Sequence, residues 1–138
     1  MMDVGTVTDL ALRALPADGL IVSPEKVREV VRGFAASEQH FHAAAFDDQR
    51  RAVAGIAIVT ADMPFHEGRE AAVMFCYSER PGAGLRLWKL AMQWFHADPT
   101  LKRIRWDQND RFDERIWEFA RRLGLKHHRS AFLCIKGT

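Results

Sequence analysis

Four segments in the middle of the chain carry the apolar patterns of β-strands. Residues 51–60 and 70–78 are apolar on both faces, as strands at the centre of a sheet are. Residues 40–46 are extended, and the polar turn 47–50 joins them to the first of these strands as a hairpin. Residues 101–106 alternate between apolar and polar side chains, which predicts a further strand.

Helical spacing of apolar residues marks three further segments. Ser23-Pro24-Glu25 is a typical helix start, because Ser accepts a free backbone amide and Pro suits the first turn, and the helix continues to Phe34. A second helix has apolar residues at 3.6-residue spacing across 85–95. The last spans 112–123, and Gly124 closes it in a left-handed conformation.

Both ends of the chain are predicted to hold further elements. Residues 4–7 are expected to form a short first strand, and Thr8 or Asp9 to cap a helix that Pro16 stops. Residues 130–136 are expected to form a last strand that pairs back into the sheet. The predicted order is β-α-α-β-β-β-α-β-α-β, an α/β fold with its sheet in the middle.

Length and composition indicate one globular domain over residues 1–138, since 48% of the chain is hydrophobic and 28% is charged. The net charge of +2 gives no argument for nucleic acid, and the arginines of the last predicted helix alternate with acidic residues, as on a solvated face. No specific nucleic-acid partner is therefore expected. No apolar stretch reaches the roughly 20 residues that span a bilayer, and no signal-peptide pattern is present, so a cytoplasmic protein without a membrane partner is expected. Cys76 and Cys134 lie in apolar runs, where buried free thiols are expected.

The stretch 79–84, Glu-Arg-Pro-Gly-Ala-Gly, joins a predicted strand directly to a helix. Such a junction presents backbone amides at the positive end of the helix, where a phosphate group can bind. Gly82 and Gly84 leave room for close approach, and Arg80 adds a cation. The stretch is neither a Walker loop nor the dinucleotide fingerprint, whose third glycine is replaced by Leu87. A tight connection without a ligand is the alternative interpretation.

Two motifs resemble those of the GNAT superfamily of acyl-CoA-dependent N-acetyltransferases. The family signature Gln/Arg-x-x-Gly-x-Gly/Ala is similar to Arg80-Pro-Gly-Ala-Gly84, which has one residue fewer before its first glycine. The later Leu-Gly-Phe motif is similar to Leu123-Gly-Leu125. The resemblance covers roughly the C-terminal two thirds of the chain. It implies a mixed, mostly antiparallel central sheet flanked by helices on both faces, with a splayed strand pair before the phosphate-binding turn.

The resemblance also implies a site for acetyl-CoA. Three amides of the glycine turn, helped by an arginine, would hold the pyrophosphate: Gly82, Ala83, Gly84 and Arg80. The backbone of the preceding strand would lie along the pantetheine arm and polarise the thioester carbonyl: Phe75, Cys76 and Tyr77. Asn109, beyond the next strand, matches a polar position that commonly contacts the cofactor.

Acetyl transfer to an amine requires a base for the ammonium proton and often an acid for the leaving thiolate. The family frequently has a Tyr as this acid three residues before its Leu-Gly-Phe motif, where this chain has Ala120. Tyr77 is the substitute candidate, with a packed ring as the alternative. Carboxylates at strand ends are the candidate bases, with solvated caps as the alternative: Glu67, Glu70, Glu79 and Asp107.

His40 and His42 lie two residues apart and share one face of a predicted strand. That spacing suits a metal ion, but no third ligand accompanies it, and surface histidines are the alternative. No metal site is therefore predicted.

Two functions from different classes fit the sequence. The first is an N-acetyltransferase that moves an acetyl group from acetyl-CoA to an amine of a small molecule or a protein. The second follows from a resemblance to small GNAT-like proteins of short-tailed bacteriophages. The chain is similar to them in size and in its C-terminal segment Ile135-Lys136-Gly137. The resemblance implies a catalytically degenerate virion or assembly protein, in the host cytoplasm or the particle, with other virion proteins as partners. A homo-oligomer is left open in both cases, because a fold does not fix a function.

Overall fold

The computed structural model of the chain describes residues 3–15, 20–106 and 114–126. The chain divides into two compact units, Met1–Asp107 and Gln108–Thr138. The described part of the first unit contains a sheet and the helices α1 to α3, and that of the second contains α4 (Glu114–Arg122). The single domain over residues 1–138 stays a prediction.

The sheet of the first unit has four strands in the order β1-β2-β3-β4. They are β1 (Phe41–Phe46), β2 (Ala52–Asp62), β3 (Arg69–Ser78) and β4 (Leu101–Arg105). The pairs β1–β2 and β2–β3 are antiparallel, whereas β3 and β4 are parallel. The parallel pair needs a crossover, which α3 (Ala83–Ala97) provides. The predicted mixed, mostly antiparallel α/β sheet is confirmed, and each of the four predicted central strands is present.

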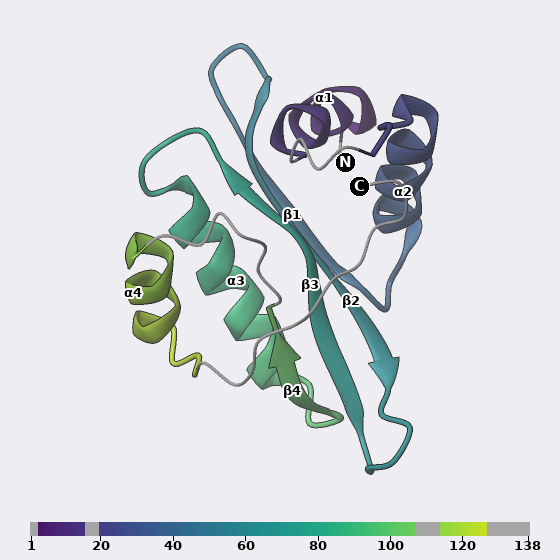
Figure 1. The fold of residues 1–138 in the computed structure, drawn as a ribbon, viewed down its shortest axis with the longest axis vertical. Coiled ribbons are helices and arrows are strands. Elements are labelled where there is room, and N and C mark those ends of the chain that lie inside the picture. The colour runs from purple at the N-terminus through teal and green to yellow at the C-terminus, as the bar shows by residue number, and fades with distance from the viewer. Residues whose placement is uncertain (1–2, 16–19, 107–113, 127–138) are drawn as a thin grey trace. The chain divides into compact units, whose positions relative to one another are not determined.

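Helices pack on both faces of this sheet, and β3 shows which face each one covers (Figure 1). The side chains of Phe75 and of Leu10, in α1 (Val4–Ala14), both lie close to Gly55. The next residue of β3, Cys76, instead accepts a hydrogen bond from Trp88 of α3. Successive side chains of a strand point to opposite faces, so α1 and α3 lie on opposite sides of the sheet.

The first helix corrects the prediction for the N-terminal residues. A strand at residues 4–7 and a cap at Thr8 or Asp9 were expected, but α1 begins at Val4 and its cap is Asp3, whose carboxylate accepts from the Thr6 amide at 3.2 Å. Thr8 lies inside the helix and donates to the Val4 carbonyl at 2.6 Å. The burial of Leu10 and Ala11 against the sheet outweighs the strand preference of the valines.

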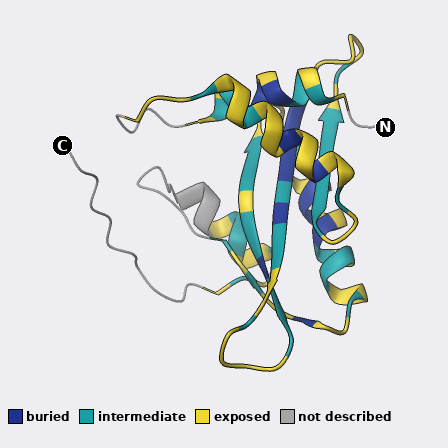
Figure 2. Cartoon of the chain, turned by 90° about the vertical axis from the view of Figure 1, so that its right-hand side faces the viewer, coloured by how far each residue is buried: buried dark blue, intermediate teal, exposed yellow. Residues whose placement is uncertain are grey.

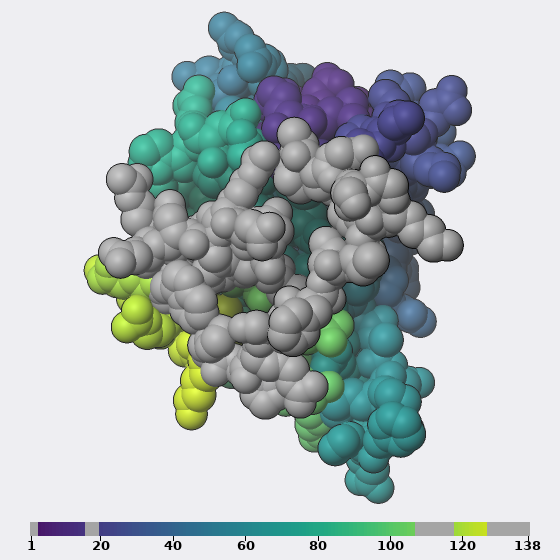
Figure 3. Space-filling model, in the orientation of Figure 1, coloured from purple at the N-terminus to yellow at the C-terminus, as the bar shows by residue number. Residues whose placement is uncertain are grey.

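The second helix, α2 (Pro24–Ala36), starts where the sequence predicts. The Ser23 hydroxyl accepts from the Lys26 amide at 3.4 Å, and Pro24 occupies the first turn. Val31 and Phe34 are buried from this helix. In the space-filling view, α1 and α2 are in contact at the end of the first unit opposite the β2–β3 loop (Figure 3).

The core lies between the middle strands and the helices (Figure 2). The largest fully buried side chains come from both helix layers and from the sheet: Leu10, Ile58 and Trp88. The β2–β3 loop extends away from this core, and Phe65 at its tip is 90% exposed. Among the described helices, none has the length and apolarity needed to cross a membrane.

The second unit shows the predicted left-handed end of α4. Gly124 has φ of +84°, and its amide donates to the Arg121 carbonyl at 3.0 Å. The Leu125 amide donates to the Ala120 carbonyl, also at 3.0 Å. These two bonds form a Schellman motif, which favours glycine. The predicted strand 130–136, with Cys134, lies outside the described residues.

We predict opposite effects on stability for two Gly→Ala substitutions. Gly68→Ala places a Cβ 2.5 Å from Lys102 Cγ and 3.0 Å from the Thr100 carbonyl at φ of +94°. It should lower the free energy of unfolding by about 1–2 kcal/mol. Gly33→Ala adds a Cβ in open space inside α2 and should raise that free energy by roughly 0.5–1 kcal/mol. Urea unfolding measures both, and a stabilising Gly68→Ala would contradict the described loop.

Candidate functional site

The strands β3 and β4 pair only along the first part of β3. Their parallel register begins with Arg69 opposite Leu101 and ends with Ala72 opposite Arg105, the last residue of β4. Beyond this point, residues 73–78 of β3 pair with β2 alone within the described part of the chain. Among the described residues, no strand pairs with their backbone groups on the β4 side, and unpaired groups of this kind suit a ligand. This is the splayed strand pair that the family resemblance implied.

A β-bulge lies at the point where the two strands part. Ala57 of β2 is opposite Phe75, whereas its neighbour Ile58 is opposite Val73. Met74 is thus the extra residue of β3, and it is 56% exposed. A bulge bends and twists its strand locally, and such features are common next to active sites.

The helix α3 starts directly after β3 through the glycine turn. Gly82 is its N-cap with φ of +81°, a conformation that favours glycine, and no described side chain caps this end. The Ala83 amide donates to the Arg80 carbonyl at 3.3 Å, and the first helical bond runs from the Arg86 amide to the Gly82 carbonyl. The amides of Gly84 and Leu85 therefore have no partner within the helix. A Cβ at Gly82 would meet no atom of the described residues within 4 Å, so these residues leave space beside the turn.

Ser78 holds the turn in place at the end of β3. Its hydroxyl donates to the Arg80 carbonyl at 2.8 Å and lies 3.3 Å from the Arg80 amide, which donates to it. A Cβ at Gly84 would lie 3.2 Å from Ser78 Cβ. The small residue at position 84 thus lets the start of α3 lie against the end of β3.

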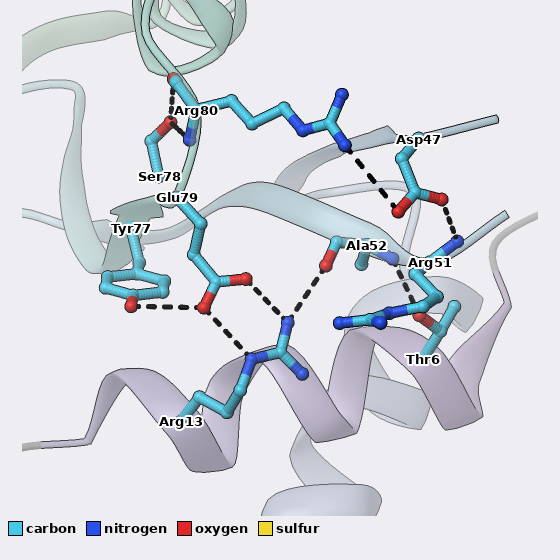
Figure 4. Close-up of polar contacts among 9 residues, drawn as sticks. All are labelled: Thr6, Arg13, Asp47, Arg51, Ala52, Tyr77, Ser78, Glu79 and Arg80. Atoms are coloured by element: carbon cyan, nitrogen blue, oxygen red, sulfur yellow. Dashed lines mark hydrogen bonds and ion pairs between the residues drawn. The ribbon is translucent and has the colours of Figure 1, made fainter. Parts of the chain in front are cut away.

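The Arg80 side chain extends away from the start of α3 (Figure 4). Its guanidinium lies 3.8 Å from the carboxylate of Asp47, in the β1–β2 turn. The Asp47 carboxylate also accepts from the amides of Gln49 and Arg51, each at 2.9 Å. The Arg51 amide above all holds the pKa of Asp47 below its ordinary value, with a smaller contribution from Arg80.

On the α1 side of the sheet, Glu79 links β3 to α1. The Arg13 guanidinium donates to both carboxylate oxygens of Glu79, at 2.7 and 3.0 Å, and to the Ala52 carbonyl at 3.1 Å. The Tyr77 hydroxyl donates to the same carboxylate at 3.3 Å (Figure 4). The bonds from Arg13 lower the pKa of Glu79, whereas burial, and then Glu79, raise the pKa of Tyr77. Tyr77 therefore keeps its proton at neutral pH, and Glu79 is a poor base.

On the α3 side, Cys76 carries a free thiol. The fully buried Trp88 donates from Nε1 to its sulfur at 3.1 Å. Burial raises the pKa of Cys76 to about 11. A half-buried thiol that stays protonated is a packing group and not a nucleophile.

Of the remaining predicted site residues, Glu70 and Glu67 lie away from this group. Glu70 lies at the paired end of β3, where its carboxylate contacts Arg103 and lies 3.6 Å from Arg105. It is separated from Ser78 by the length of β3, roughly 25 Å at the usual rise of a strand. Asp107 and Asn109 lie outside the described residues. Glu67 lies in the exposed β2–β3 loop.

The structure thus brings Tyr77, Arg80 and the glycines together at the end of β3. It adds residues that the sequence did not single out, chiefly Arg13, Asp47, Met74 and Ser78. Ser78 had a local signal, because it lies two residues before Arg80 and Ser often bonds to nearby backbone in turns. No local pattern indicates the partners Arg13 and Asp47. No group of three or more His, Cys, Asp or Glu suited to a metal ion occurs among the described residues.

Comparison with known proteins gives matches only at the level of structure. No protein-family model and no curated protein matches the chain. A probable acetyltransferase superposes with a TM-score of 0.75 at 13% identity, covering 98% of this chain and 93% of that one. A GNAT family acetyltransferase from Staphylococcus aureus has a TM-score of 0.64 at 11% identity, with coverages of 98% and 94%. AAC(6')-Iy, in complex with the bisubstrate analog CoA-S-monomethyl-acetylneamine, has a TM-score of 0.72 at 8% identity, with coverages of 98% and 92%.

The chain has the GNAT fold. The matches extend over nearly the full length of each structure, including the N-terminal helices that lie outside the two sequence motifs. Identities this low show a shared fold and leave each relative's substrate a property of that relative. The resemblance to bacteriophage proteins stays a prediction.

We predict that Arg13 controls the acidity of Glu79. In Arg13→Gln, the pKa of the Glu79 carboxyl, followed by NMR, should rise towards its ordinary value because its two charged donors are lost. Arg28→Gln, an exposed change in α2, is the matched control and should leave it unaltered. An unchanged pKa in Arg13→Gln would contradict the described pair. The pair stabilises the fold above the ordinary pKa of Glu, and this contribution is lost as the pH falls through the lowered value.

We also predict that the Cys76 thiol resists alkylation in the folded protein. In a Cys134→Ser background, iodoacetamide at pH 8 should react with Cys76 at least tenfold more slowly than in urea, because its raised pKa keeps the half-buried thiol protonated. Mass spectrometry of the labelled chain measures both rates. Equal rates would show that Cys76 is accessible.

Proposed function

We propose that the chain is an N-acetyltransferase that takes its acetyl group from acetyl-CoA. The observation that carries the proposal is the uncapped start of α3 beside the unpaired edge of β3. Both are backbone features, so they recognise a phosphate and an extended amide chain without a particular side chain. The GNAT fold supports the proposal, as does the CoA-derived analog in the AAC(6')-Iy structure.

The pyrophosphate is assigned to the turn at the start of α3. The amides of Gly82, Ala83 and Gly84 are the proposed donors, at the positive end of a 15-residue helix, and the Ala83 amide would exchange its 3.3 Å bond to the Arg80 carbonyl for one to the phosphate. The open space beside Gly82 fits this role. Arg80 remains a proposed contributor, because its guanidinium is well exposed and its weak contact with Asp47 is easily exchanged.

The pantetheine arm is assigned to the unpaired edge of β3. Phe75, Cys76 and Tyr77 lie beyond the end of the pairing with β4 and before the turn. Their backbone groups on that side suit the two amides of pantetheine, as an added strand would. The bulge at Met74 marks the proposed position of the thioester. Asn109 stays a proposed contact.

Acetyl-CoA supplies an acyl thioester, and the chain's contribution is to orient it and to handle protons. The amine nitrogen bonds to the carbonyl carbon, the carbon–sulfur bond breaks, and CoA leaves as the thiol while the amine loses one proton. Tyr77 is the proposed proton donor, since its phenol stays protonated and lies two residues from Phe75 along β3. Glu70 and Asp107 stay weak proposals for the base, and the two arginines on Glu70 oppose that role.

The acceptor is proposed to be an amine of a small molecule or a protein. The alternative of a bacteriophage virion or assembly protein has no observation of this structure in its favour and stays a prediction. The same holds for a homo-oligomer and for a cytoplasmic location.

We predict that a negative charge at the start of α3 abolishes CoA binding without destabilising the fold. Ala83→Glu places a carboxylate in the first turn of α3, where it complements the helix dipole but repels a pyrophosphate. Calorimetry with acetyl-CoA should show at least tenfold weaker binding, and thermal unfolding should be unchanged or slightly raised. The control Gln93→Glu adds the same charge at an exposed site on the same helix and should bind as the parent does. No heat with the parent chain at millimolar acetyl-CoA would end the proposal.

A further inference from the structure

A cavity of about 280 Å³ lies on the α1 and α2 face of the sheet. It is lined by residues from both helices and from β1, β2 and β3, including Val27, Val31, Phe34, Ala57 and Phe75. All but two of its described lining residues have apolar side chains or are glycine. An apolar cavity of about 150 Å³ holds benzene, so this one has room for a substituted aromatic ring or a short alkyl chain.

The two polar exceptions are His42 and Lys26, and His42 is the unusual one. Its Nδ1 is shielded from solvent and has no hydrogen-bond partner among the described residues. Burial lowers the pKa of His42, so the ring is neutral near pH 7 and one of its nitrogens accepts a hydrogen bond. His40, two residues earlier in the chain, is satisfied, because its Nδ1 accepts from the Thr60 amide at 3.1 Å. Buried polar atoms without a partner are rare in folded proteins, and a hydrogen-bond donor on a bound ligand would satisfy this one.

The cavity adjoins the position proposed for the thioester. His42 is opposite Ala57, and Ala57 is opposite Phe75, so these three residues form a row across β1, β2 and β3. At the usual spacing of strands, the two ends of this row lie roughly 10 Å apart. The bulged Met74 also lines the cavity. A ligand in the cavity thus reaches from His42 to the point where β3 parts from β4.

The charges of the cavity restrict the ligand. Its described lining contains no carboxylate, and Lys26 adds a positive charge on the exposed side of α2. A polycationic amine would be repelled and would find no partner for its charges. An amine with a single amino group on an apolar body avoids both the repulsion and the unpaired charges. A plain acyl chain would also fill the space, but it would leave His42 without a hydrogen bond.

We propose that this cavity binds the acceptor, a primary amine with an apolar body that ends in a hydrogen-bond donor to His42. The inference rests on the proposed acetyltransferase function, and the cavity places the amino group at Phe75 and the donor at His42. His42 is a binding residue in this assignment and takes no part in the proton transfers.

The test compares two amines that differ by one hydroxyl, 4-hydroxyphenethylamine and phenethylamine. Calorimetry with the full chain should show at least tenfold tighter binding of the hydroxylated amine, because a site built to bond a donor rejects the analogue that lacks it. His42→Phe keeps the shape of the cavity and should remove this difference. His66→Phe, in the exposed β2–β3 loop, is the matched control and should retain it. Ala57→Leu fills the cavity and should weaken both amines.

Equal affinities of the two amines in the parent chain would overturn the inference, as would a difference that survives in His42→Phe. Spermidine that binds as tightly as 4-hydroxyphenethylamine would also overturn it. Octanoyl-CoA that binds more tightly than acetyl-CoA, an advantage lost in Ala57→Leu, would assign the cavity to an acyl chain instead. Acetyl-CoA binding is measured separately. If it binds and the amines are not distinguished, the inference alone fails; if the amines behave as expected and acetyl-CoA does not bind, the proposed function fails and the acceptor assignment with it.

Discussion

The parallel pairing between β3 and β4 ends at Ala72, and the arrangement of the site depends on that limit. Along residues 69–72, β3 pairs with β2 on one side and with β4 on the other, and the ion pairs of Glu70 with Arg103 and Arg105 link β3 to β4 at this end. Beyond it, no second described strand pairs with β3, and this edge leads into the glycine turn. A longer β4 pairing would occupy the backbone groups that the proposed ligand needs. The first part of β3 thus pairs within the sheet on both sides, and its second part forms the proposed binding edge.

The alternation of side chains along β3 separates the proposed tasks between two faces of the sheet. Cys76 and Ser78 face α3, where the phosphate end of acetyl-CoA is proposed to bind. Phe75 and Tyr77 face α1 and the apolar cavity, where the acceptor is proposed to bind. Arg13 crosses from α1 to Glu79 and to the Ala52 carbonyl, so it fixes α1 against the ends of β2 and β3. The proposed phosphate and acceptor sites are therefore built from different elements that meet along one strand.

Local patterns in the sequence predicted the elements well where several signals agreed. The strands at the centre of the sheet, the Ser23 cap and the Gly124 end each combine a pattern with a suitable terminal residue, and each is confirmed. Residues 4–7 are the exception, because two valines suggested a strand while the Asp3 cap and the buried face of Leu10 decide for a helix. The glycine turn was predicted as a strand-to-helix junction and is one. Three features of the structure depend on contacts between distant parts of the chain, so no local pattern in the sequence predicted them. They are the bulge at Met74, the Arg13–Glu79 pair and the unpartnered nitrogen of His42.

The most direct test of the account is a map of backbone amide shifts by NMR as CoA is added to the full chain. The account predicts that the largest shifts fall on two groups on either side of residues 78–81, the amides of residues 75–77 and those of residues 82–85. The amide of Gly33, in the middle of α2, should not move. Shifts confined to α2 and β1, or no shifts at millimolar CoA, would contradict the claim that the open edge of β3 and the start of α3 form a binding site.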